Sequence, residues 1–253
     1  MKKEFPILEY DPTKVAVIEP SRIISPIKIP EHCVITFFQE IIEKLKKEGK
    51  AKQIANEISE IGTFPIYEVH SGKKEFALFH PGIGAPMAAG LLEFAIALGC
   101  RKFIACGGAG VFDQKMQGKI VLPTAAIRDE GTSYHYLPPS REVFPDPEAL
   151  SSIKEILINH NYNFIFTKTW TTDAIYRETS PKIQLRKNEG CSVVEMEAAT
   201  FFAVAKFRGV QFAQILYGGD IVGGDKWIQY ESKSRATMRE KIFWLAVEAC
   251  LNL

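Results

Sequence analysis

Apolar residues form two kinds of pattern along the chain, which predict helices and strands in succession. Apolar residues at helical spacing predict helices; these segments are 34–47, 86–98, 147–159, 198–207 and 232–251. Short, continuous apolar runs predict buried strands, at 14–18, 102–106, 119–126, 164–171 and 210–217. Residues 66–70 and 75–79 flank a Ser-Gly-Lys-Lys turn and predict a hairpin, whereas the pattern of 53–61 is ambiguous.

Glycine-rich segments separate several of these predicted strands and helices. Gly82-Ile83-Gly84 leads into the predicted helix 86–98, and Gly107-Gly108-Ala109-Gly110 follows the predicted strand 102–106. Strand, glycine loop and helix in succession are typical of a mixed or parallel sheet with helices on both faces. Neither segment is a dinucleotide-binding GxGxxG or contains the Lys-Ser/Thr of a P-loop. The pattern predicts an α/β fold, and the 253 residues predict a single domain spanning residues 1–253.

Composition and charge narrow the class of ligand. Hydrophobic residues make up 46% of the chain and charged residues 24%, and the formal net charge is +1. Without excess charge the chain lacks the field that attracts nucleic acid or an anionic membrane, so a small-molecule substrate is expected. The five cysteines form no CxxC pair and the five histidines are scattered, which predicts reduced core thiols and no metal site. No signal-peptide pattern or long apolar segment is found, so a cytoplasmic location is expected.

The stretch 193–220 brings two carboxylates together. Glu195-Met196-Glu197 opens the predicted helix 198–207, and the strand 210–217 then leads to Asp220. A helix of about a dozen residues descends about 18 Å, and a strand of about seven residues climbs back about 23 Å. Glu197 and Asp220 therefore return to the edge at which the strands end, where α/β sheets bind ligands. Such a pair suits a polyol or a protonatable ring, although Glu195 is equally explained as an acidic residue that complements the helix dipole.

The sequence Glu195-Met196-Glu197-Ala198-Ala199, followed 23 residues after Glu197 by Asp220, resembles the nucleoside phosphorylase family. That family includes purine nucleoside phosphorylases, uridine phosphorylases and related nucleosidases, and the spacing matches its hexameric purine enzymes. HPGIGAP and FIACGGAGVF resemble its two glycine loops, and the resemblance extends from about Val15 to the C-terminus. It implies a three-layer α/β/α domain with a mixed, partly barrel-like central sheet. It also implies a homo-oligomer built from dimers, such as a hexamer.

The activity implied by this resemblance is reversible phosphorolysis of the N-glycosidic bond of a nucleoside, preferably a purine nucleoside. Phosphate would be the co-substrate, with no other cofactor. Glu195, Met196 and Glu197 would bind the ribose, and the Glu197 carboxylate would accept from its 2′- and 3′-hydroxyls and favour an oxocarbenium-like transition state. Asp220 would be the acid that protonates the base at purine N7. Asp225 is the alternative acid.

The segment from Thr172 to Tyr176 resembles the end of the family's base-binding strand. Ile175 stands where the family has a stacking Phe, so its contact with the base would be apolar. Tyr176 either contributes to the base site or packs in the core. The Gln/Arg pair with which uridine phosphorylases read uracil is not recognisable here, and those enzymes generally lack the acid at the position of Asp220. These features favour a purine, with a uridine phosphorylase as the alternative.

The chain departs from the family at the expected phosphate site. Ala105 and Gly108 stand where the family's loop has an Arg and a hydroxyl residue. Arg22, in Glu-Pro-Ser-Arg, matches the family's Asp-Pro-x-Arg turn, so Arg22 and the amides of Gly107 and Gly108 are the expected phosphate ligands. Because two side-chain contacts are missing, two alternatives remain open. One is a hydrolytic nucleosidase in which Glu19 activates water, and the other is a non-catalytic protein that binds or stores nucleosides.

Overall fold

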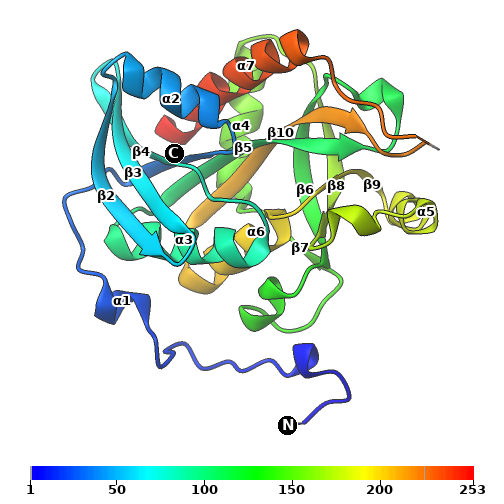
Figure 1. Ribbon diagram of the computed structural model, residues 1–253, viewed down its shortest axis with the longest axis horizontal. Helices are drawn as coiled ribbons and strands as arrows, with labels where there is room; N and C mark the ends of the chain where they lie inside the picture. Colours follow the sequence, from blue (N-terminus) through cyan, green and yellow to red (C-terminus); the bar gives the residue numbers. More distant parts are fainter. Residues whose placement is uncertain (1, 225) are drawn as a thin grey trace.

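Ten strands form one mixed sheet in the computed structural model, which describes residues 2–224 and 226–253 (Figure 1). They are β1 (His32–Thr36), β2 (Ala51–Ser59), β3 (Gly62–Ser71), β4 (Lys74–Phe79), β5 (Lys102–Val111), β6 (Ile120–Asp129), β7 (Glu142–Val143), β8 (Phe164–Thr172), β9 (Cys191–Glu195) and β10 (Gln211–Ile221). The order is β10-β6-β8-β9-β5-β1-β4-β3-β2, with β7 paired to β6. Because β10 also pairs with β5, strands β5, β10, β6, β8 and β9 close into a barrel, from which β1, β4, β3 and β2 extend.

Helices cover both faces of this sheet (Figure 1). On one face lie α3 (Ala85–Leu98) and α6 (Ala198–Arg208), and on the other lie α2 (Gln39–Lys47), α4 (Pro147–Asn159) and α7 (Ser232–Leu251). Two further helices are short, α1 (Pro20–Ile23) and α5 (Ser180–Asn188). The predicted α/β fold, with a mixed and partly barrel-like sheet between helical layers, is confirmed. Among the described residues, none of the helices combines the length and the apolar character needed to cross a membrane.

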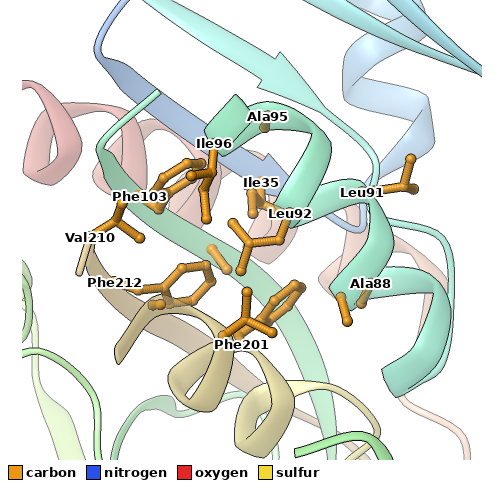
Figure 2. Packing of buried hydrophobic residues seen from close by; sticks show 14 of the residues in the cluster. Ile35, Ala88, Leu91, Leu92, Ala95, Ile96, Phe103, Phe201, Val210 and Phe212 are labelled. Atoms are coloured by element: carbon orange, nitrogen blue, oxygen red, sulfur yellow. The ribbon is translucent and has the colours of Figure 1, made fainter. Parts of the chain in front are cut away.

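Strand β5 shows why the central strands are apolar along their whole length. Phe103 is buried against α3 and α6, and the next residue, Ile104, is buried against α4 and α7. Successive strand residues face opposite sides of a sheet, and helices cover both sides here. In the first of these two cores Phe201 of α6 stacks on Phe212 of β10, with ring centres 4.9 Å apart, beside Leu92 of α3 (Figure 2).

Local signals at their ends explain why several helices agree with the sequence prediction. Pro147 occupies the first turn of α4, and Asp146 Oδ1 accepts a hydrogen bond from the amide of Ala149 at 2.9 Å. Helix α6 stops at Gly209, whose φ of 70° is in the left-handed region. The ends of α3, α4, α6 and α7 lie within one residue of the predicted ones.

The prediction of a strand at 14–18 is wrong. These residues form no strand, and Val17 and Ile18 are 101% and 75% exposed. The first strand is β1, which lies partly inside the segment predicted to be helical from Val34, and α2 begins only after it. Val34 and Ile35 are buried on opposite faces of the sheet, between β4 and β5. A short apolar run fits a strand as well as the start of a helix, and pairing on both sides favours the strand.

The second glycine segment is part of a strand, whereas the sequence predicted a loop. β5 continues through Gly107, Gly108 and Gly110 beside β10, and none of the three has a positive φ. A Cβ placed on Gly108 would lie 2.8 Å from Cζ of Tyr217, so glycine allows the two strands to approach. β10 likewise continues through Gly218, where it was predicted to end, with a register shift at that point.

Candidate active site

The ends of several strands open into one cavity of about 1220 Å³. Residues at or just after the carboxyl ends of β1, β4, β5, β9 and β10 line it, and α7 contributes two arginines. Strands β5 and β9 are antiparallel, but they pair only near their carboxyl ends, where Gly110 lies opposite Val194. The ends of both strands therefore meet at the cavity, which is the position at which α/β sheets bind ligands. This volume exceeds the range of about 300–1,000 Å³ that is typical of pockets for single small ligands.

Glu195 is buried, and its carboxylate is used within the chain. Oε1 accepts hydrogen bonds from the hydroxyls of Thr169 at 3.1 Å and Thr171 at 2.6 Å. Oε2 accepts from the amides of Glu197 at 2.7 Å and Ala198 at 2.6 Å. Burial raises the pKa of Glu195, and these four hydrogen bonds oppose that shift. Glu195 therefore complements the start of α6, and it acts on the site by positioning Glu197.

Glu197 lies in the cavity beside Met196 and is only 5% exposed. Its Oε1 accepts a hydrogen bond of 2.6 Å from the amide of Gly84, directly before α3. Gly82 and Gly84 have φ values of 74° and 91°, so this first glycine segment is a true strand-to-helix loop. The pKa of Glu197 is raised to about 8, mainly by burial and secondly by the charge of Glu195. Hydroxyl groups of a ligand that donate to this carboxyl would favour its ionised form.

Asp220 lines the same cavity from β10. Its Oδ1 accepts from the amide of Tyr230 at 2.8 Å, and its Oδ2 accepts from Nε1 of Trp227 at 3.2 Å. Both donors belong to the segment between β10 and α7, which therefore fixes the carboxylate. The structure brings Glu197 and Asp220 to one cavity, at the strand ends where the sequence placed them. Asp225, the alternative acid, lies outside the described residues.

Ile175 and Tyr176 line the cavity on the short 3₁₀ turn Ile175–Arg177 that follows β8. Tyr176 is 94% exposed, so the alternative that placed it in the core is wrong. Glu178 lies beside them, and burial raises its pKa to about 7. A carboxyl with such a pKa can both accept and donate hydrogen bonds near neutral pH.

The structure separates Arg22 from the cavity. Arg22 is exposed on α1 and does not line the cavity, because residues 14–18 do not form the strand that would deliver it there. Glu19 is 5% exposed, and its Oε1 accepts a hydrogen bond from Nη1 of Arg208 at 3.0 Å. Arg208 also pairs with Glu93 of α3 at 2.7 Å. Glu19 thus anchors the N-terminal segment to α6, and in this position it cannot activate water in the cavity.

His80 and Gln214 are among the polar groups of the cavity that were not predicted from the sequence. His80 Nδ1 accepts a hydrogen bond from the amide of Gly82 at 3.0 Å, and burial lowers the pKa of this imidazole. Gln214 is 1% exposed, and its Oε1 has no partner within the described chain. A buried acceptor without a partner is unfavourable, and a donor on a ligand would satisfy it. His80 belongs to the HPGIGAP motif, which could have revealed it, whereas an apolar strand gives no signal for Gln214.

Three cations line the cavity, Lys226, Arg235 and Arg239. All three follow β10 in the chain, and none of them was predicted from the sequence to bind phosphate. Of the two glycines expected to bind phosphate, Gly108 lines the cavity and Gly107 does not. The positive charge of the cavity therefore comes from the C-terminal part of the chain.

One group of metal-type ligands lies elsewhere, on β3 and β4. Glu68, His70 and Glu75 bring ligand atoms within 4.8 Å of one another, and His70 Nε2 lies 3.4 Å from Glu68 Oε1. His70 and Glu75 face each other in register and are exposed. None of the three lines the cavity, and they form a solvated group of charged side chains.

Known proteins share this fold. The chain is 30% identical over 147 residues to a guanosine phosphorylase from Halorubrum lacusprofundi, and the match covers 57% of this chain and 61% of that protein. The structure of a uridine phosphorylase from Vibrio fischeri ES114 has a TM-score of 0.75 at 18% identity, covering 94% of this chain and 98% of that one. A purine nucleoside phosphorylase from Toxoplasma gondii in complex with immucillin-H has a TM-score of 0.74 at 18% identity, covering 95% and 96%.

The family model for the phosphorylase superfamily matches residues 31–247. This span begins directly before β1 and ends within α7, so it includes every residue that lines the cavity. It begins after Arg22, in agreement with the position of that residue outside the cavity. The match confirms the resemblance based on the spacing from Glu197 to Asp220. The chain belongs to the phosphorylase superfamily.

Proposed function

We propose that this protein is a nucleoside phosphorylase that acts on purine nucleosides. The observation that carries the proposal is the position of the buried Glu197 carboxyl and of Asp220 in one cavity. In the reaction the bond between C1′ and the base nitrogen breaks, and an oxygen of phosphate bonds to C1′. The phosphate loses one proton and the base gains one, so the products are the free base and ribose 1-phosphate.

Glu197 is the proposed ligand of the ribose. Its carboxylate would accept from the 2′- and 3′-hydroxyls, and these donors would offset the burial that raises its pKa. In a site closed from water the negative charge would also stabilise positive charge that develops at C1′. Met196, which lines the cavity beside it, would supply an apolar surface for the sugar.

Asp220 is the proposed acid for the leaving base. A carboxyl group near purine N7 can protonate it or hydrogen-bond to it, and the contacts with Trp227 and Tyr230 hold the side chain ready for this role. Ile175 and Tyr176 would contact the faces of the base. The guanosine phosphorylase among the relatives supports a purine, because guanine carries an N7 and uracil does not.

The test is an assay of inosine, guanosine, adenosine, uridine and methylthioadenosine, each with and without phosphate. We expect purine nucleosides to be cleaved faster than uridine, only with phosphate, and with ribose 1-phosphate as the product. Free ribose formed equally fast without phosphate would make the protein a hydrolase. Binding of a nucleoside without any cleavage would favour the storage or binding alternative.

We also propose that the protein is a homo-oligomer. Large apolar side chains are exposed in the N-terminal segment, at Val17 and Ile18, and at the β2–β3 turn, at Ile58 and Ile61, each at least 73% exposed. Association would remove this apolar surface from water. Light scattering combined with size-exclusion chromatography measures the mass, and a mass of 28.4 kDa would refute the proposal.

A further inference from the structure

Two arginines of α7 line the cavity. Arg235 and Arg239 are four positions apart, so they project from the same side of the helix about one turn from each other. Like charges at this spacing repel and destabilise a helix. Within the described part of the chain, Arg235 has neither an ion pair nor a side-chain hydrogen bond. An anion between the two guanidinium groups would relieve this repulsion.

Contacts on three sides hold Arg239 in place. Its Nε donates to the hydroxyl of Tyr217 at 3.1 Å, and its Nη1 donates to Oε1 of Glu40 at 2.8 Å. The guanidinium also lies 5.3 Å from the centre of the Phe38 ring. Glu40 is half exposed and offsets part of the charge, but Nη2 has no partner among the described residues. Arg239 is therefore fixed in orientation and still has donors for a ligand.

The hydroxyl of Tyr217 occupies the space that a side chain at position 108 would fill. A Cβ placed on Gly108 would lie 2.9 Å from this oxygen. The oxygen accepts from Arg239, which leaves the phenolic proton free to donate to a second acceptor. A guanidinium and a hydroxyl thus meet beside Gly108, inside the cavity.

We propose that Arg235, Arg239 and the Tyr217 hydroxyl form a subsite for a phosphate group. They would supply the charge and the hydroxyl that Ala105 and Gly108 do not carry. Planar guanidinium groups bind phosphate oxygens through paired, charge-assisted hydrogen bonds, which suits a dianion. This inference rests on the proposed phosphorolysis when the bound group is inorganic phosphate. The same chemistry also fits the 5′-phosphate of a nucleoside monophosphate.

Steady-state kinetics test the subsite with Arg239→Gln, Arg235→Gln and Tyr217→Phe, and with Lys241→Gln as the matched control. Lys241 lies on the same helix near Tyr162, outside the cavity. We expect at least a tenfold rise in the KM for phosphate in each arginine variant, while the KM for the nucleoside changes less than twofold. Lys241→Gln should leave both values unchanged. Arg235→Gln removes no side-chain hydrogen bond or ion pair among the described residues, so it tests the subsite even if Arg239→Gln unfolds the protein.

Calorimetric titrations with inorganic phosphate and with a nucleoside 5′-monophosphate identify the source of the phosphate group. A loss of phosphate affinity of at least tenfold in Arg235→Gln and Arg239→Gln supports the subsite for the nucleophile. A loss confined to the monophosphate supports the same subsite for the 5′-phosphate. Unchanged affinity for both ligands overturns the proposal. If the wild-type protein cleaves no nucleoside but binds phosphate through these arginines, the proposed function fails and the subsite stands.

Discussion

The two ends of the cavity are built in different ways. At the proposed sugar end, Glu195 and Glu197 come from one short segment, and their carboxyl oxygens accept hydrogen bonds from backbone amides at the starts of α6 and α3. At the proposed anion end, Tyr217 of β10 joins Arg235 and Arg239 of α7, and the fold brings these side chains together. The sugar end therefore depends on burial and on pH, whereas the anion end depends on the packing of α7 against the sheet.

The largest effect is expected at the sugar end, from Glu197→Gln. The amide oxygen can still accept a hydrogen bond, but the amide supplies no charge, and the loss of one charged hydrogen bond is worth about 1.5–3 kcal/mol. We expect kcat/KM for a purine nucleoside to fall about 100-fold, and by at least tenfold. Steady-state kinetics on the folded variant measure this loss. Unchanged activity would remove Glu197 from the sugar end.

The pH dependence of the same variant tests whether burial raises the pKa of Glu197. The pKa of Glu197 is about 8 in the folded chain and about 4.5 when exposed, so its burial costs stability progressively as the pH rises through this window. Glu197→Gln should gain stability over the wild type between these pH values, while the wild-type kcat/KM should rise with pH towards about 8. Thermal unfolding and kinetics from pH 5 to 9 measure both effects. A constant stability difference across this range would contradict the buried, protonated carboxyl.

We expect the next largest effect from Asp220→Asn. This variant tests contact with the base independently of the sugar end and the anion end. Asn can still accept from the amide of Tyr230, so the fold should persist. Cleavage of purine nucleosides should slow at least tenfold, whereas a riboside with a nitrophenolate leaving group, which needs no proton, should slow less than threefold. Parallel assays of the two substrates measure the difference. Equal losses would assign Asp220 a structural role.

The same contrast explains how much the sequence could predict. The spacing from Glu197 to Asp220 placed both carboxylates in one cavity correctly, because a strand, a helix and a returning strand fix their relative positions. Arg239 gave no signal, because its position in the cavity depends on how α7 packs against β10 and on contacts with Glu40 and Tyr217. Local patterns cannot supply such long-range information.

The order of elements was predicted well where both faces of a strand are covered, and poorly in the N-terminal segment. Residues 14–18 and 32–36 are both short apolar runs, but only the second has partner strands on both sides. Periodicity does not distinguish these cases, because neighbouring strands in the sheet decide them. The match of Glu-Pro-Ser-Arg to the family's turn, directly after this incorrect strand, also led to the expectation of Arg22 at the phosphate site.

A smaller effect is expected from Thr171→Val, which acts on the sugar end indirectly. Thr171 Oγ1 donates to Glu195 and accepts from the amide of Ala199 at 3.0 Å, and the residue is fully buried. Valine should lower the free energy of unfolding by about 1–3 kcal/mol, because buried groups lose their partners. The kcat/KM should fall only a few-fold, since Glu195 keeps its other three hydrogen bonds. Denaturant unfolding and kinetics measure the two quantities, and a loss as large as that of Glu197→Gln would place Thr171 in direct contact with the substrate.

The smallest effect is expected from Arg22→Ala, which tests where the anion end lies. Arg22 is exposed on α1 and precedes the part of the chain that matches the family model. The substitution should therefore leave the KM for phosphate within twofold of the wild type, at the same temperature of unfolding. Arg22→Ala is also a matched comparison for Arg239→Gln, since each variant removes one positive charge from the chain. If Arg22→Ala raises the KM for phosphate and Arg239→Gln does not, the anion end is formed by the N-terminal segment, as the sequence first indicated.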